Sequence, residues 1–184
     1  MPADRRKALA SVAKRCQVRI VEDDPYWLLA DTPPPPIATW APEQVTYIAT
    51  LSKCLTPGLR VAFVRICDPQ ERERFLTALR SFAPMVAPLT AALATRWILD
   101  GSAMELVAGV GKEAQLRHRM AWNILAGRYS GAPEGLHIWL ELPSYWSPAQ
   151  LARAAGSEGI AVLSSEKTAY ELCGLMYGVG ITKS

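Results

Sequence analysis

The sequence predicts an α/β fold followed by a smaller α+β domain, and three observations support this expectation. Short apolar, β-branched runs alternate with longer stretches at helical spacing, a pattern typical of strands packed beside helices. Proline and glycine separate these runs. After residue 85 the pattern changes to mainly helical stretches with a few short strands. We therefore expect two domains, residues 1–84 and residues 85–184, in a chain long enough for a real core.

The composition is ordinary for a globular protein, with 184 residues of which 50% are hydrophobic and 20% charged. The formal net charge of +3 is spread along the chain, and no Lys/Arg run is long enough to predict a nucleic-acid-binding arm. No stretch approaches the apolar length needed to cross a membrane. The polar N-terminus lacks the apolar region of a signal peptide. We expect a cytoplasmic protein without a membrane partner.

The cysteines and histidines give no sign of a metal site. The four cysteines are Cys16, Cys54, Cys67 and Cys173. They show no C-x-x-C spacing, so we expect thiols in a reducing cytoplasm and neither a disulfide scaffold nor a zinc site. His118 and His137 have no partner ligands at metal spacing, and we expect both to be structural.

The first half of the chain predicts a helix and three strands. Residues 3–15 place apolar side chains between charges at helical spacing. The segments 17–24, 45–51 and 60–67 are short, apolar and rich in β-branched residues, so each predicts a strand. Together they favour a sheet buried on both faces. Four consecutive prolines within residues 31–37 predict an irregular or polyproline-like loop.

The second half predicts mostly helices. These cover residues 69–81, 89–99, 102–127 and 147–157. Ser147 before Pro148 is a cap signal for the last helix, and Pro84 and Pro88 separate the first two. The predicted strands are short and cover residues 135–143, 159–165 and 175–181. This order of elements favours a smaller α+β domain.

Three clusters of chemically active residues sit at the ends of predicted strands. They are Glu-Asp-Asp-Pro-Tyr at residues 22–26, Thr-Leu-Ser-Lys at 50–53 and Pro-Gly-Leu-Arg at 57–60. In open α/β sheets, ligands bind outside the carboxyl ends of the strands. We therefore interpret the three clusters together, as parts of one site.

These clusters resemble the active-site motifs of fold-type-I aminotransferases, which depend on pyridoxal 5'-phosphate (PLP). In that family a strand ends in D-x-x-Y, and a later segment has the pattern S-K-x-x-x-P-G-L-R. The chain has Asp23-x-x-Tyr26 and, about thirty residues later and in the same order, Ser52-Lys53-Cys54-Leu55-Thr56-Pro57-Gly58-Leu59-Arg60. Two motifs in the right order are much more specific than either alone.

The likeness extends over essentially the whole chain, and it is closest in character to the aminotransferase-like domain of MocR-type regulators in the GntR family. In those regulators a DNA-binding winged helix precedes the domain. The resemblance implies the C-terminal part of a PLP-transferase (aspartate aminotransferase-like) large-domain sheet, followed by the smaller α+β C-terminal domain.

The resemblance also implies which residues would meet the reactive part of the cofactor. Lys53 would form an imine with the aldehyde of PLP. Asp23 would keep the pyridine nitrogen protonated, and the phenol of Tyr26 would lie near the ring oxygen. We expect Asp24 to be structural, because the three-residue offset to Tyr26 selects Asp23.

The cofactor phosphate would be held by residues of the other two clusters. The guanidinium of Arg60 offers a fork of charged donors, which suits a phosphate better than a lysine does. Thr50 and Ser52 would add hydroxyl donors. For Cys54, beside Lys53, we expect a small side chain that packs.

Both ends of the chain depart from the family pattern. A full domain of this type is about twice as long, and its phosphate loop, its stacking aromatic residue and its asparagine are absent here, so we expect a truncated domain. Near the C-terminus the family has L-R-L-G, whereas the chain has Leu175-Met176-Tyr177-Gly178. Methionine cannot donate to a substrate carboxylate. This difference favours a sensor or a degenerate domain over transamination.

Two functions from different classes follow from the resemblance. The first is a PLP-dependent aminotransferase-like domain that acts on, or senses, an amino acid or amine. The alternative is a non-catalytic effector or oligomerisation domain of a MocR/GntR-type regulator. The chain alone is expected to be inactive. Exposed sheet edges predict self-association, as a homodimer, and contact with nucleic acid is expected only through a missing N-terminal domain.

Overall fold

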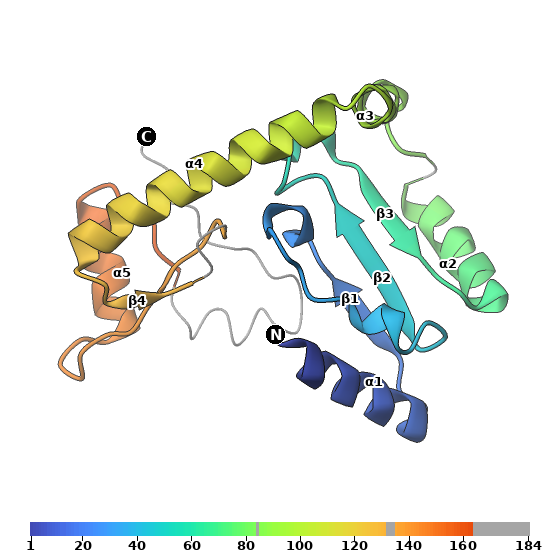
Figure 1. The fold of residues 1–184 in the computed structure, drawn as a ribbon, viewed down its shortest axis with the longest axis horizontal. Coiled ribbons are helices and arrows are strands. Elements are labelled where there is room, and N and C mark those ends of the chain that lie inside the picture. The colour runs from blue at the N-terminus through green and yellow to red at the C-terminus, as the bar shows by residue number, and fades with distance from the viewer. Residues whose placement is uncertain (84, 132–134, 164–184) are drawn as a thin grey trace. The chain divides into compact units, whose positions relative to one another are not determined.

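A computed structural model describes residues 1–83, 85–131 and 135–163 (Figure 1). The chain divides into two compact units, Met1–Gly111 and Lys112–Ser184. The domain boundary expected between residues 84 and 85 lies within the first unit and stays a prediction. The expected strand over 175–181 and the residues Cys173 and Met176 lie outside the described part of the chain. Within the described residues, no helix is both long enough and apolar enough to cross a membrane.

The first helix, α1 (Ala3–Cys16), agrees with the expected helix within one residue at its end. It ends at Gln17, whose backbone adopts a left-handed conformation (φ 53°) and donates to the carbonyl of Ala13. Asp4 lies in the first turn and two basic residues lie in the last, which is the favourable order for the helix dipole. The face with Ala10 and Ala13 is buried.

Three strands form the sheet of the first unit: β1 (Ile20–Asp23), β2 (Val45–Thr50) and β3 (Ala62–Arg65). Their spatial order is β1-β2-β3, with β1 parallel and β3 antiparallel to β2. Two short 3-10 helices, η1 (Trp27–Leu29) and η2 (Ile37–Thr39), lie between β1 and β2. The expected proline-rich loop therefore ends in a helical turn at Ile37.

Part of the core of this unit lies beside β2. One cluster of buried residues there consists of Ala10, Ile37, Ala38, Ala41 and Val45. The expectation of a sheet buried on both faces is wrong for the described residues. Along β1, half-buried residues alternate with exposed ones, and every residue of β3 is exposed. The physical reason is the uneven cover within the described residues: η2 packs on β2 and α1 packs on η2, whereas β3 has no helical contact of comparable extent.

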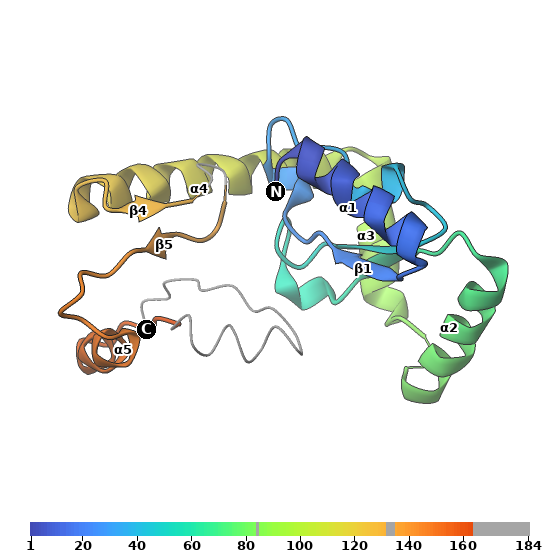
Figure 2. The same ribbon diagram turned by 90° about the horizontal axis from the view of Figure 1, so that it is seen from below.

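Two helices follow β3 in the first unit, and both begin at a proline, which fits the first helical turn. In α2 (Pro69–Phe82), the side chain of Asp68 caps the start by accepting from the backbone of Gln70 at 2.9 Å. The next helix is α3 (Pro88–Leu99), which contacts the segment Pro57–Leu59. Figure 1 shows α1 on the β1 side and α2 on the β3 side of the sheet, and Figure 2 again shows α1 beside β1.

The long helix α4 (Ser102–Leu125) begins in the first unit and continues into the second. Beyond it, β4 (Tyr129–Ser130) and β5 (Trp139–Leu140) form an antiparallel pair. The expected strand over 135–143 is thus reduced to two residues, and residues 159–163 of the expected strand 159–165 form no strand. In α5 (Pro148–Ser157), the expected cap at Ser147 is a full capping box with Gln150.

Candidate cofactor site

The strand directions bring the three chemically active clusters to one edge of the sheet. Asp23 is the last residue of β1 and Thr50 is the last residue of β2. Because these strands are parallel, both carboxyl ends lie at the same edge (Figure 1). Since β3 is antiparallel, its amino end returns to that edge, and Thr50 pairs there with Ala62. Arg60 lies two residues before Ala62. The third cluster therefore precedes a strand, where the sequence analysis had it at the end of one.

The register fixes the spacing along the edge. Asp23 pairs with Ile48, so Thr50 lies two residues further along β2. At the usual rise of a strand, this offset is roughly 7 Å.

The loop from Leu51 to Arg60 is held by the backbone of its first residue. The Leu51 amide donates to the carbonyl of Val61 at 3.2 Å. The Leu51 carbonyl accepts from the amides of Leu55 at 2.9 Å and Thr56 at 3.2 Å. The loop is thus tied to the start of β3, and it presents Lys53 from a closed turn.

The residues beside Lys53 order this turn further. The hydroxyl oxygen of Thr50 accepts from the amide of Ser52 at 3.0 Å. The thiol of Cys54 donates to the carbonyl of Thr50 at 3.4 Å. Cys54 is fully buried, in agreement with the expected packing role, and its burial raises the pKa of the thiol, which keeps the proton that it donates. Lys53 itself is half-buried.

Arg60 adopts an unusual backbone conformation. A 3-10 turn, η3 (Pro57–Leu59), ends at Arg60, which has φ 51° and ψ 39°. A non-glycine residue in this left-handed region costs on the order of 1–2 kcal/mol. Arg60 is exposed, whereas its neighbours Leu59 and Val61 are buried. The turn therefore presents one cationic side chain at the surface between two anchored apolar residues.

The D-x-x-Y motif forms one electrostatic unit at the end of β1. Although Asp23 as a whole is exposed, partial shielding from water raises the pKa of its carboxyl. Burial raises the pKa of the Tyr26 phenol, and the nearby charge of Asp23 raises it further. A cation beside Asp23 would offset the shielding and favour its carboxylate form.

Asp24 belongs to the other face of β1, as expected for a structural residue. Asp24 follows the last residue of β1 and contacts Tyr47, which is paired with Glu22 in the sheet, so it lies on the side of Glu22. The Tyr47 hydroxyl donates to Asp24 at 3.5 Å. Burial, followed by the charges of Asp24 and Glu22, raises the pKa of Tyr47 to about 12.

Glu22 is an important residue that the sequence analysis did not single out. Its carboxylate accepts from the guanidinium of Arg6 at 3.0 Å and from the amides of Ile37 at 2.9 Å and Ala38 at 3.1 Å. Only 9% of its side chain is exposed. Glu22 thereby joins α1, β1 and η2, directly behind the residue that begins the motif. The one sequence signal that could have indicated this role of Glu22 is the position of a carboxylate on the inward side of a short strand.

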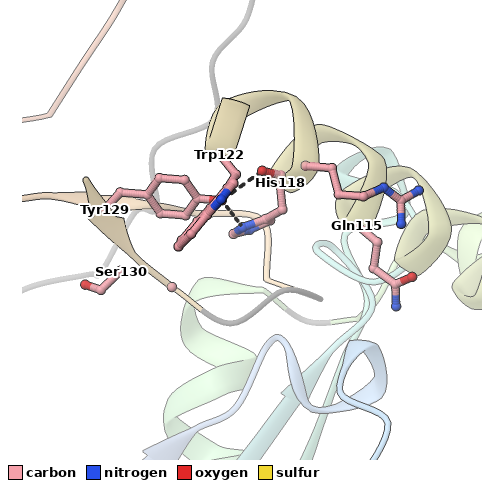
Figure 3. A pocket seen from close by; sticks show the side chains of 7 residues that line it. Gln115, His118, Trp122, Tyr129 and Ser130 are labelled. Carbon is pink, nitrogen blue, oxygen red and sulfur yellow. Dashed lines mark hydrogen bonds between the residues drawn. The ribbon is translucent and has the colours of Figure 1, made fainter. Parts of the chain in front are cut away.

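The second unit contains a separate hollow of about 510 Å³ beside α4 and β4 (Figure 3). It is lined by Gln115, His118, Arg119, Trp122, Tyr129, Ser130 and Gly131. His118 is buried, and its two ring nitrogens lie 3.3 Å from the Tyr129 hydroxyl and 2.9 Å from the carbonyl of Gly135. These contacts agree with a structural role for His118. None of the site residues expected from the sequence lines this hollow.

Metal binding finds no support in the described part of the chain. Over residues 1–83, 85–131 and 135–163, no three His, Cys, Asp or Glu side chains gather closely enough to hold a metal ion.

Comparisons with known proteins connect this geometry to a class of fold. The chain matches the α-aminoadipate aminotransferase LysN of Thermus thermophilus with a TM-score of 0.74 and 27% identity, over 87% of this chain and 44% of that one. It matches the kynurenine aminotransferase of Pyrococcus horikoshii with a TM-score of 0.73 and 26% identity, over 89% and 42%. The fold, together with the three clusters at one edge of the sheet, defines the C-terminal part of an aminotransferase-like domain of the aspartate aminotransferase fold.

The sequence relatives are of two kinds, regulators and enzymes. The chain is 33% identical to the HTH-type transcriptional regulator YdeF of Bacillus subtilis, over 91% of this chain and 36% of the relative. It is 29% identical to the 2-aminoadipate transaminase of Thermus thermophilus, over 87% and 43%. No protein-family model matches the chain. The chain thus resembles PLP-dependent aminotransferases and MocR-like regulators, and it spans only about a third to two fifths of the length of these relatives.

Proposed function

We propose that this part of the domain contributes one side of a PLP site, with the cofactor held covalently through Lys53. The observation that supports this proposal most strongly is the sheet edge. The directions of β1, β2 and β3 bring the D-x-x-Y motif, Lys53 and Arg60 to one edge, although they are far apart in sequence.

The side chains at this edge suit the chemistry of PLP, which supplies an aldehyde for amines and a ring that withdraws electrons. The amine of Lys53 is the nucleophile for the aldehyde. The carboxylate of Asp23 keeps a proton on the ring nitrogen. Partial burial raises the pKa of Asp23, which disfavours its charged form. A protonated ring nitrogen beside Asp23 would favour its carboxylate form.

The phosphate of the cofactor needs donors at the other end of the site. Arg60 supplies a guanidinium fork, and the hydroxyls of Thr50 and Ser52 add donors. The Thr50 oxygen already accepts from the Ser52 amide, so its own proton remains to donate to a phosphate oxygen. The phenol of Tyr26 lies within the electrostatic influence of Asp23 and would hydrogen-bond the ring oxygen.

The proposed ligand of the parent protein is an amino acid or another small amine, because PLP chemistry begins with amines. Methionine at position 176 takes the place where the family has a carboxylate-binding arginine, and a site without that arginine favours sensing over fast transamination. The proposed setting is cytoplasmic.

The second candidate is a non-catalytic effector or oligomerisation domain of a MocR/GntR-type regulator. It is favoured by the number of regulators among the relatives. Besides YdeF, the chain is 28% identical to the HTH-type regulator YdfD of Bacillus subtilis and 27% identical to YdcR of Escherichia coli. In this proposal the domain forms a homodimer, and nucleic acid is bound elsewhere in the parent protein.

Cofactor trapping tests the proposed function. The chain is mixed with PLP and reduced with borohydride, and the adduct is located by peptide mass spectrometry. We expect modification concentrated on Lys53 and lost in Lys53→Ala. The exposed Lys7 on α1 provides the matched control, because Lys7→Ala should leave the adduct unchanged. Adducts spread over surface lysines, or none at all, would refute PLP binding by this chain. A further assay separates an enzyme from a sensor: amino acids are added to the parent protein, and only an enzyme removes their amino group.

A further inference from the structure

We propose that Thr56 is a positioning residue for Arg60: its hydroxyl and backbone hold the turn that gives Arg60 its left-handed conformation, and so fix the guanidinium for a phosphate. This inference rests on the proposed PLP site and deepens it. Thr56 occupies a variable position of the S-K-x-x-x-P-G-L-R motif, so the motif itself assigns it no role.

Three polar groups of Thr56 are used within the loop. Its amide donates to the carbonyl of Leu51 at 3.2 Å. Its carbonyl accepts from the amide of Leu59 at 3.3 Å, and its hydroxyl oxygen accepts from the amide of Gly58 at 3.4 Å. Thr56 therefore joins the turn that contains Lys53 to the turn that precedes Arg60.

The chain beyond Thr56 leaves Arg60 little freedom. Pro57 fixes its own φ at the start of η3. Leu59 is buried to 3% exposure, and Val61, on the other side of Arg60, is buried to 7%. With both neighbours anchored, the chain must reverse its direction at Arg60, and it does so with φ 51°. A strained residue of this kind persists only when its surroundings determine its conformation.

Among the groups of Thr56 that hold the turn, the hydroxyl can be removed without changing the shape of the side chain. Valine has the same branching as threonine but cannot accept from the Gly58 amide. Serine keeps the oxygen and loses only a methyl group. If the hydroxyl positions Arg60, Thr56→Val should disturb the turn and Thr56→Ser should preserve it.

The first measurement is PLP affinity by equilibrium titration, combined with a double-mutant cycle. Thr56→Val should weaken PLP binding about tenfold, because a displaced guanidinium loses part of its charge-assisted bond to the phosphate. Thr56→Ser should stay within about twofold of the unsubstituted chain. In an Arg60→Ala background, Thr56→Val should have no further effect. The matched control is Thr77→Val, at an exposed position of α2.

The second measurement does not depend on the cofactor. A residue with positive φ gives an unusually strong intraresidue NOE between its amide and Hα protons. We expect this signal at Arg60 in the unsubstituted chain and in Thr56→Ser, and a weaker signal in Thr56→Val.

The two proposals can fail separately. An equal loss of PLP affinity on the Arg60→Ala background, or an unchanged NOE in Thr56→Val, would overturn the role of Thr56 while PLP binding stands. If no variant binds PLP, the proposed function fails, and the NOE alone decides whether Thr56 sets the conformation of Arg60.

Discussion

At the scale of single residues, the acidic side chains at the end of β1 lie in two different environments. Asp23 begins the motif on one face, where partial burial raises its pKa. On the other face, Asp24 accepts from Tyr47, and Glu22 accepts from three donors. A one-residue shift in the strand register would exchange these environments. The distinction between Asp23 and Asp24 therefore depends on the register as much as on the motif.

Tyr47 gives a pH-dependent prediction. Its folded-state pKa of about 12 is raised above the ordinary value of 10. The stability that this phenol contributes is thus fully present below pH 10 and is lost as the pH rises towards 12. We expect the free energy of unfolding to fall over this window, and to fall less steeply in Tyr47→Phe.

Denaturant titrations at several pH values measure this effect, and Tyr145→Phe is the matched control. Tyr145 is 77% exposed, so its removal should leave the alkaline slope unchanged. Equal slopes for the unsubstituted chain and Tyr47→Phe would contradict the raised pKa of Tyr47.

The sequence was most informative where residues carry a spaced motif. The offsets among Asp23, Tyr26, Lys53 and Arg60 match two motifs of the family that the chain resembles, and their roles toward a cofactor stay predictions. Glu22 could not be identified in this way. Its role depends on Arg6, sixteen residues earlier, and on two backbone amides of η2, and no local pattern encodes such a contact.

At the scale of elements, the strands of the first unit follow directly from their β-branched runs, whereas their burial does not. A run such as residues 62–65 is apolar enough for a buried strand, yet each of its residues is exposed. Burial depends on what packs against the strand, and the described residues provide cover mainly beside β2. The second unit was harder to predict because β4 and β5 are only two residues long.

Glu22 should be the most sensitive link between the elements of the first unit. In Glu22→Gln the Arg6 guanidinium loses its charged partner, and one of the two η2 amides loses a carboxylate acceptor. Because the Glu22 and Arg6 side chains are only 9% and 15% exposed, we expect a loss of roughly 2–4 kcal/mol in the free energy of unfolding.

Urea denaturation measures this loss, with the exposed i,i+4 pair of Glu113 and Arg117 on α4 as the control. Glu113→Gln should cost less than about 0.5 kcal/mol. Similar costs for the two substitutions would mean that the contacts of Glu22 do not hold α1, β1 and η2 together.

At the scale of the whole molecule, much apolar surface is exposed in the described part of the chain. Val21 on β1 is 68% exposed and Phe63 on β3 is 50% exposed. Apolar surface of this extent favours association with further protein. The chain spans about a third of the length of the regulators that it resembles. The homodimer remains a proposal for the parent protein.

The central claim is that Asp23, Lys53 and Arg60 form parts of one PLP site at one sheet edge. The most direct test is an equilibrium titration of the chain with PLP, followed by the absorbance of the cofactor. We predict saturation at one PLP per chain, abolished by Lys53→Ala and weakened by Asp23→Asn and by Arg60→Ala. Arg65→Ala, on the exposed β3, should change nothing. Binding that does not saturate, or that Lys53→Ala, Asp23→Asn and Arg60→Ala all leave unchanged, would contradict the claim.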